Sequence, residues 1–244
     1  MVSPGGRAPA PSGPVGSTPS GRGCTPIRPM VERVTDPSDL NPIEPRPGEP
    51  SADAEAMVMP AAEPNKVSPH GFKHKLGRLV WGVVQGTVFR WSPRPCHRWR
   101  VFLLKMFGAD VSPLARPYPG CKIWAPWNLT MGDYATLADN VDCYAVGRIT
   151  IGTRTTVSQY SYLCGATHDF EHPRFPLTPF DITIGEHCWL AADVFVAPGV
   201  TIGDGAVVGA RSSVFRDLPA WKVCAGSPAK PLRDRVVREE GSPA

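Results

Sequence analysis

The chain of 244 residues lacks several features that would place it in a familiar class of protein. Its seven cysteines form no Cys-x-x-Cys pair and are odd in number, which argues against a disulfide framework and against a structural zinc site. No apolar run is long enough to span a bilayer, and residues 1–66 contain no apolar core of the length that a signal peptide needs. We therefore expect a cytoplasmic protein with reduced, mostly buried thiols.

Residues 1–66 contain little that could form a hydrophobic core. They hold 14 of the 29 prolines, seven glycines, six basic and eight acidic residues, and they show no apolar periodicity. Such a composition cannot bury enough apolar surface to offset the entropy lost on folding. We expect this segment to be a disordered tail.

Residues 67–107 contain no acidic residue but eight cations: Lys73, Lys75, Arg78, Arg90, Arg94, Arg98, Arg100 and Lys105. Apolar residues recur there at spacings of three and four, which predicts two amphipathic helices on either side of the break at residues 92–95. These apolar residues are Leu76, Leu79, Val80, Val83, Val84, Trp99, Phe102, Leu103 and Met106. The helices either pack on the main domain with a solvated basic face or contact an anionic membrane at its inner face. No DNA- or RNA-binding motif accompanies the charge, so we expect no nucleic-acid partner.

A six-residue repeat organises the rest of the chain. From residue 184 onward an aliphatic residue occupies every sixth position: Ile184, Leu190, Val196, Ile202, Val208 and Val214. A small or apolar residue follows four positions after each: Cys188, Val194, Val200, Ala206, Ser212 and Leu218. The residue directly after each aliphatic residue is mostly tiny, as at Gly185, Ala191, Ala197, Gly203 and Gly209.

A period of six is typical of a chain that makes three short strands per coil of a triangular prism. The aliphatic residue then points inward, the small residue fills the corner, and the tiny residue permits the tight turn. The same pattern upstream includes Ile151, Val157 and Leu163 in one coil, Met131, Leu137 and Cys143 in another, and Val111 and Ile123 in a looser first coil. We therefore predict an all-β domain, a parallel β-helix of about five coils over residues 108–235, preceded by the helical segment 67–107.

One long interruption breaks this count. Leu163 and Ile184 are 21 positions apart, so residues 167–181 must leave the prism as a loop. A loop that projects from a rigid scaffold is a common place for catalytic residues. This loop contains His168, 17 positions after Ile151.

The stretch DITIGEHCWLAADVFVAPGVTIGDGAVVGARSSVFRDLP, the closing AGSPAK and the position of His168 resemble the hexapeptide-repeat acyltransferases. Within them the chain is most similar to galactoside- and maltose-type O-acetyltransferases and to colanic-acid-type acetyltransferases of exopolysaccharide clusters. The similarity covers residues 75–235, including LLKMFGADV. It implies a left-handed parallel β-helix, a homotrimer with sites between subunits, acetyl-CoA as donor, and a hydroxyl of a sugar or polysaccharide precursor as acceptor.

The resemblance also implies roles for particular residues. His168 corresponds to the general base, which removes the proton from the acceptor hydroxyl during attack on the thioester, while backbone N–H groups stabilise the oxyanion. The resemblance also assigns six residues to the binding of CoA. Their cations would meet the phosphates of CoA, and their small side chains would lie beside its pantetheine arm. The six residues are Trp189, Ala191, Ala210, Arg216 (where relatives often have lysine), Lys230 and Arg233.

The acceptor pocket is less well defined by the sequence. Galactoside-type relatives place an asparagine on the coil before the histidine, whereas ungapped counting puts Ala138 at that position here. Asn140 or Asp142 could substitute if the turn has a different shape. Asp169 lies in the loop, which is rich in proline and aromatic residues and compatible with sugar stacking.

Three alternatives accompany this interpretation. Zinc-dependent enzymes also use this fold, but His168 and His172 are only four apart and coils two and three supply no histidine, so we expect no metal. Cys164 could form an acyl-enzyme with His168, although its position usually takes any small residue that fits. A non-catalytic β-helix that serves as an oligomeric scaffold or binding module is the third.

Overall fold

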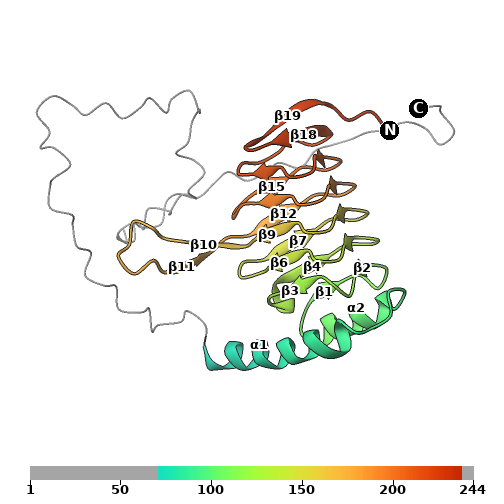
Figure 1. The fold of residues 1–244 in the computed structure, drawn as a ribbon, viewed down its shortest axis with the longest axis vertical. Helices are drawn as coiled ribbons and strands as arrows, with labels where there is room; N and C mark the ends of the chain where they lie inside the picture. The colour runs from blue at the N-terminus through green and yellow to red at the C-terminus, as the bar shows by residue number, and fades with distance from the viewer. Residues whose placement is uncertain (1–70, 238–244) are drawn as a thin grey trace, which may run out of the picture.

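The structure, a computed structural model, describes residues 71–237. The predicted disordered tail at residues 1–66 lies outside the described residues. Three sheets, parallel except for the last strand of face B, form the faces of a triangular prism, and within each coil the chain passes from face A to face B to face C (Figure 1). The chain is therefore the predicted left-handed parallel β-helix.

Each face is a stack of very short strands. Face A consists of β1 (Asp110–Val111), β4 (Leu129–Met131), β7 (Ile149–Ile151), β12 (Ile182–Ile184) and β15 (Thr201–Ile202). Face B consists of β2 (Arg116–Pro117), β5 (Thr136–Leu137), β8 (Thr156–Val157), β13 (Trp189–Leu190), β16 (Val207–Val208), β18 (Lys222–Gly226) and β19 (Ala229–Asp234). Face C consists of β3 (Lys122–Ile123), β6 (Asp142–Tyr144), β9 (Tyr162–Cys164), β14 (Phe195–Val196) and β17 (Ser213–Val214).

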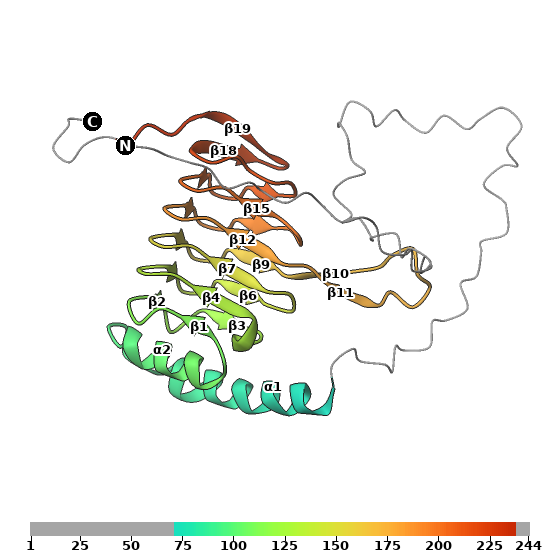
Figure 2. The same ribbon diagram turned by 180° about the vertical axis from the view of Figure 1, so that it is seen from behind.

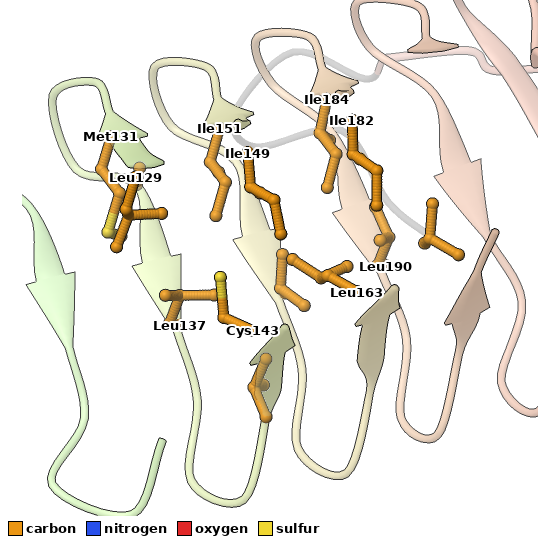
Figure 3. Close-up of a cluster of buried hydrophobic side chains, with 14 of the residues drawn as sticks. Leu129, Met131, Leu137, Cys143, Ile149, Ile151, Leu163, Ile182, Ile184 and Leu190 are labelled. Atoms are coloured by element: carbon orange, nitrogen blue, oxygen red, sulfur yellow. The ribbon is translucent and has the colours of Figure 1, made fainter. Parts of the chain in front are cut away.

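The interior of the prism is a column of aliphatic side chains from successive coils. Figure 3 shows labelled members of this column from residue 129 to residue 190, all pointing into the space between the faces. Ile151, Ile184 and Ile202 on face A are 0 % exposed, as are Leu163 and Val196 on face C. The inward positions predicted from the six-residue repeat are confirmed. Burial of each such side chain contributes about 2 kcal/mol, so the column supplies most of the driving force for folding.

The number of coils differs slightly from the prediction. Five three-sided coils are followed by a partial sixth, in which Leu218 pairs with Ile202 on face A and Cys224 pairs with Val208 on face B. Leu218 follows the inward Val214 after four residues instead of six, so a strict count of six assigns it to a corner. This corner has two residues fewer than a regular corner, so its turn is shorter, while the side chain of Leu218 still points into the column.

The tiny residues after the inward positions have a different role from the one predicted. Ten of the corners have a left-handed residue three positions after the inward residue, at Tyr134, Asn140, Arg154, Tyr160, His187, Asp193, Gly199, Gly205, Arg211 and Trp221. A Cβ at Gly152 would lie 2.5 Å from the carbonyl carbon of Gly185, and a Cβ at Gly203 would lie 2.5 Å from the nitrogen of Ala220. The tiny residues are thus required because successive coils stack closely there, and the turn conformation itself is carried mostly by other residue types.

Two polar corner residues join neighbouring coils. The Thr155 hydroxyl donates to the Gly185 carbonyl at 2.6 Å and accepts from the Cys188 N–H at 2.9 Å. Ser161 does the same one corner later, with the Ala191 carbonyl at 3.2 Å and the Val194 N–H at 3.2 Å. Each hydroxyl therefore pairs with a carbonyl and an N–H of the next coil, which satisfies backbone groups buried at these corners.

The long interruption forms an arm, which we define as residues 165–181. Its strands β10 (Ala166–His168) and β11 (Leu177–Pro179) pair antiparallel, with His168 opposite Leu177. Both views show the arm projecting away from the column at the corner between face C and face A (Figures 1 and 2). The prediction that this segment leaves the prism is confirmed.

The predicted helices are also present, and they lie across the first coil at one end of the column (Figures 1 and 2). They are α1 (Phe72–Val84), the π-helical η3 (Gln85–Phe89) and α2 (His97–Met106), while a short 3-10 helix, η4 (Pro126–Asn128), follows the first coil. Trp81 is buried and donates from Nε1 to the Ile123 carbonyl at 2.6 Å. Phe89 is buried beside it.

The faces of these helices differ from the prediction in two ways. In the alternative in which the helices pack on the main domain, Leu76, Leu79, Val80 and Val83 would form the packed side of the first helix, yet they are 45–67 % exposed, because Trp81 occupies that side. Arg100 was counted among the cations of a basic face, yet it is fully buried. Its guanidinium donates to Ser92 Oγ and to the carbonyls of residues 93, 94 and 117, which ties the helix break to the first coil.

Candidate active site

His168 ends strand β10 and is exposed on the arm. Its Nδ1 lies 2.6 Å from the Phe175 carbonyl oxygen, across the hairpin. Because a carbonyl oxygen can only accept a hydrogen bond, Nδ1 carries the proton and Nε2 holds the free lone pair of the neutral ring. The backbone of the arm therefore fixes both the orientation and the tautomer of the imidazole, with the basic nitrogen directed away from this contact.

The tip of the arm is a tight turn held by backbone and side-chain contacts. The Asp169 N–H donates to the Pro176 carbonyl at 3.0 Å, and Asp169 Oδ1 accepts from the Glu171 N–H at 3.1 Å. His172 Nδ1 accepts from the Arg174 N–H at 3.1 Å. Asp169 and His172 thus shape the turn that places the Phe175 carbonyl against His168.

A stack of aromatic rings runs up the outside of face C toward and past the arm. Ring centroids lie 5.6 Å apart from Trp124 to Tyr144, 6.2 Å from Tyr144 to Tyr162, 6.0 Å from Tyr162 to Phe195, and 5.7 Å from Phe195 to Phe215. Burial raises the pKa of Tyr162 to about 12, so its hydroxyl stays protonated and can donate. Sequence reasoning missed this stack, although its members all flank inward positions on the third strand of each coil.

Two of the predicted acceptor residues lie on or beside face C. Asp142 is half-buried on β6, in the rung below Tyr162. Burial raises its pKa above the ordinary value, and the Lys122 ammonium opposes that shift in part. Asn140 occupies the left-handed position of the corner between faces B and C, with φ of 60°. Ala138 is partly buried against the core.

The residues predicted for the cofactor fall on three different parts of the prism. Trp189 lies on face B, is 50 % exposed, and donates from Nε1 to Ser158 Oγ at 3.1 Å. Lys230 and Arg233 are exposed on β19, at the end of the same face. Two others, Ala191 and Ala210, follow face B strands at the corner that leads to face C, whereas Arg216 lies at the corner between faces C and A.

This placement separates the predicted base from most of the predicted cofactor residues. The arm leaves the corner between faces C and A, which is the corner opposite face B in a triangular prism. Within one chain, His168 and Arg216 share a corner, but Trp189 and Lys230 lie on the far side of the column. A site that contains all of them requires a second copy of the chain beside the first.

The alternative chemistries find little support in the described residues. Within residues 71–237, no group of three His, Cys, Asp or Glu side chains is placed to hold a metal ion. His187 occupies the left-handed position of the corner between faces A and B, away from the arm. Burial raises the pKa of the Cys164 thiol, whose Sγ contacts the Ala166 carbonyl at 3.2 Å, so the reactive thiolate is disfavoured.

A prism of stacked hexapeptide coils with one histidine-bearing arm places the protein in the class of hexapeptide-repeat β-helices. The chain belongs to the hexapeptide-repeat transferase family. The family model "Bacterial transferase hexapeptide (six repeats)" matches residues 181–216. The colanic acid biosynthesis acetyltransferase WcaF of Escherichia coli is 52 % identical over 173 residues, which are 70 % of this chain and 95 % of that protein. The galactoside O-acetyltransferase of Escherichia coli is 35 % identical over 124 residues, which cover 50 % of this chain and 55 % of that protein.

Solved structures agree with the fold. A galactoside acetyltransferase in complex with coenzyme A has a TM-score of 0.59 and 26 % identity, over 68 % of this chain and 84 % of that one. A hexapeptide-repeat acetyltransferase of Vibrio cholerae complexed with acetyl-CoA has a TM-score of 0.62 and 23 % identity, over 70 % of this chain and 93 % of that one. The resemblance inferred from the repeat and its arm is confirmed.

Proposed function

We propose that this enzyme transfers an acetyl group from acetyl-CoA directly to a hydroxyl of a sugar or polysaccharide precursor, with His168 as the general base. The hydrogen bond from Nδ1 to the Phe175 carbonyl carries this proposal, because it leaves Nε2 as the only nitrogen that can accept a proton. An acceptor hydroxyl bound at Nε2 loses its proton as its oxygen attacks the thioester carbonyl. The tetrahedral intermediate then collapses, the C–S bond breaks, and the departing thiolate takes the proton from the imidazolium.

The Phe175 carbonyl has a second role in this mechanism. When Nε2 accepts the proton, the ring becomes a cation whose Nδ1–H still points at a carbonyl dipole 2.6 Å away. Such a charge-assisted hydrogen bond is stronger than the neutral one, so the contact stabilises the imidazolium as it forms. The backbone of the arm thus orients the imidazole, as a carboxylate does in other catalytic sites where a histidine is the general base.

The donor site in this proposal contains Trp189 and the cations Lys230 and Arg233. The relatives support acetyl-CoA as the donor, since solved neighbours carry it or coenzyme A. Because face B is opposite the arm, we propose that the active enzyme is a homotrimer in which the arm of one subunit lies beside face B of the next. Each of the three sites then combines residues of two chains.

The acceptor in this proposal binds beside face C, near the base of the arm. Half-buried aromatic rings such as Tyr144 and Tyr162 offer flat apolar surfaces to a sugar ring, and Asp142 and Asn140 offer polar groups to its hydroxyls. Relatives named for colanic acid biosynthesis and for galactoside acetylation favour a sugar-type acceptor. We place the enzyme in the cytoplasm because its proposed donor is made there.

Acetyl-CoA binding and turnover test the proposal together. Calorimetry of the full chain with acetyl-CoA should give one site per subunit, and release of free thiol should rise above the hydrolysis rate when the correct acceptor sugar is added. A trimer mass in analytical ultracentrifugation is the matching structural result. If the folded chain does not bind acetyl-CoA, the result would favour the scaffold interpretation and contradict the proposed transferase activity.

A further inference from the structure

The outer side of the helical cap carries an apolar surface that the fold does not use. On α1, Leu76, Leu79, Val80 and Val83 recur at helical spacing and are 49, 67, 45 and 61 % exposed. Exposed apolar residues of η3 and α2 also lie side by side, since Trp99 donates from Nε1 to the Val88 carbonyl at 3.2 Å and stacks on Phe102 with ring centroids 5.7 Å apart. We define the cap surface by its exposed apolar residues, Leu76, Leu79, Val80, Val83, Val88, Trp91, Trp99, Phe102 and Met106.

The orientation of the cap surface is fixed by packing on the opposite side of the helices. Trp81 is 1 % exposed and bonds to the first coil, and a Cβ at Gly77 would lie 3.5 Å from the Trp127 ring. On α2, Leu103 and Leu104 are buried. The exposed stripes therefore point away from the column as a consequence of the core contacts, and a group of exposed large apolar side chains marks a binding surface.

Positive charge surrounds these apolar residues. Lys75, Arg98 and Lys105 are exposed on α1 and α2, and Arg90 is exposed directly after η3. Residues 67–107 contain no acid, so the cations of this segment have no acidic neighbour in sequence to offset them. Trp91, which is 82 % exposed, and Trp99 lie among them, and tryptophan is the side chain that prefers the interface between lipid headgroups and acyl chains.

We propose that the cap surface docks on an anionic lipid surface, with the apolar stripe inserted between headgroups and the cations beside phosphates. An amphipathic helix with a basic rim and aromatic residues binds in this way. None of the helices within residues 71–237 is long and apolar enough to cross a membrane, so the contact is peripheral. This inference is independent of the transferase assignment, because no cap residue belongs to the proposed active site.

A second copy of the chain is a poorer occupant of the cap surface. Two cap surfaces packed against each other would bring Arg90, Arg98 and Lys105 of one copy against the same cations of the other, with no acid in residues 67–107 to separate them. Like charges at close range oppose such a contact, whereas phosphate headgroups complement it. The charge therefore selects lipid over self-association.

Vesicle sedimentation of the full chain tests this proposal. The protein should pellet with vesicles of phosphatidylcholine containing phosphatidylglycerol at low salt, be released as salt rises, and ignore pure phosphatidylcholine. Leu79→Ser should weaken binding about tenfold, because it removes a large inserted side chain. Arg98→Gln should weaken binding about fivefold, the weight of one charge near an anionic surface.

Leu232→Ser is the matched control. Leu232 is 66 % exposed, like Leu79 at 67 %, but it lies on β19 at the opposite end of the column (Figure 1). This variant should bind vesicles like the parent chain, and both serine variants should keep the parent melting temperature. No pelleting at low salt, equal loss in both serine variants, or a change in subunit number caused by Leu79→Ser alone would each overturn the proposal.

Discussion

Replacement of His168 by asparagine separates its two roles, because asparagine keeps one and loses the other. The Asn amide nitrogen lies close to the position of the imidazole Nδ1, so it can still donate to the Phe175 carbonyl that His168 contacts at 2.6 Å. It offers no basic nitrogen at the position of Nε2. We therefore expect His168→Asn to preserve the arm and to remove only the base.

The size of the effect follows from the position of His168. The side chain is exposed on the arm and contributes nothing to the aliphatic column, so the melting temperature and the affinity for acetyl-CoA should change little. Loss of a positioned general base lowers turnover by roughly 10² to 10⁴, or about 3 to 5 kcal/mol of transition-state stabilisation. His168→Ala should lose as much turnover and should also loosen the arm.

Steady-state assays of free thiol release, with acceptor and acetyl-CoA varied in turn, measure these effects. The reasoning requires a fall in kcat for both variants, with a nearly unchanged KM for acetyl-CoA in His168→Asn. Cys164→Ala, His172→Ala and added chelator should each have a much smaller effect. Full activity in His168→Asn, or an equal loss in Cys164→Ala or with chelator, would show that the base has been assigned to the wrong residue.

Substitutions at three further positions test the fold and the acceptor site by thermal melting and turnover. Val196→Asp places an unpaired charge at a fully buried position and should lower stability by roughly 3 to 5 kcal/mol, so an unchanged melting temperature would contradict the inward position of Val196 in the column. Arg100→Ala should lower stability by roughly 3 kcal/mol because it empties a fully buried position and removes the donors to the carbonyls of Pro93, Arg94 and Pro117, and Arg100→Lys should not restore it, since a single ammonium cannot reach all of them. Burial raises the pKa of Asp142, so the ionised carboxylate destabilises the fold. This loss of stability is absent below the ordinary carboxyl pKa and grows as the pH rises from that value to the raised one. Asp142→Asn should therefore raise the melting temperature at pH 7 but not at pH 3, while raising KM for the acceptor; a lower melting temperature at pH 7 would refute this account.

Several features of the candidate site could not be predicted from the sequence. His168 was identifiable from its place in the interruption, but its tautomer depends on a backbone carbonyl seven residues away, which only the hairpin register brings into contact. The aromatic stack on face C joins residues of five coils, from Trp124 to Phe215, and no local pattern connects them. The burial of Arg100 likewise depends on the packing of α2 against the first coil.

The sequence by itself determined the β-helix, its inward column and the existence of the arm. A period of six fixes which residues face inward, because each coil repeats the same three corners and an inward side chain cannot turn outward without leaving a gap in the column. Residues such as Ile184 and Val196 are therefore assigned by counting alone. Only the tertiary structure decided which side of α1 packs on the column, because Trp81 and the exposed stripe at Leu79 both satisfy helical periodicity. It also decided that the arm and face B lie on opposite sides of one chain, since that relation depends on the closure of three faces in space, which no spacing along the sequence records.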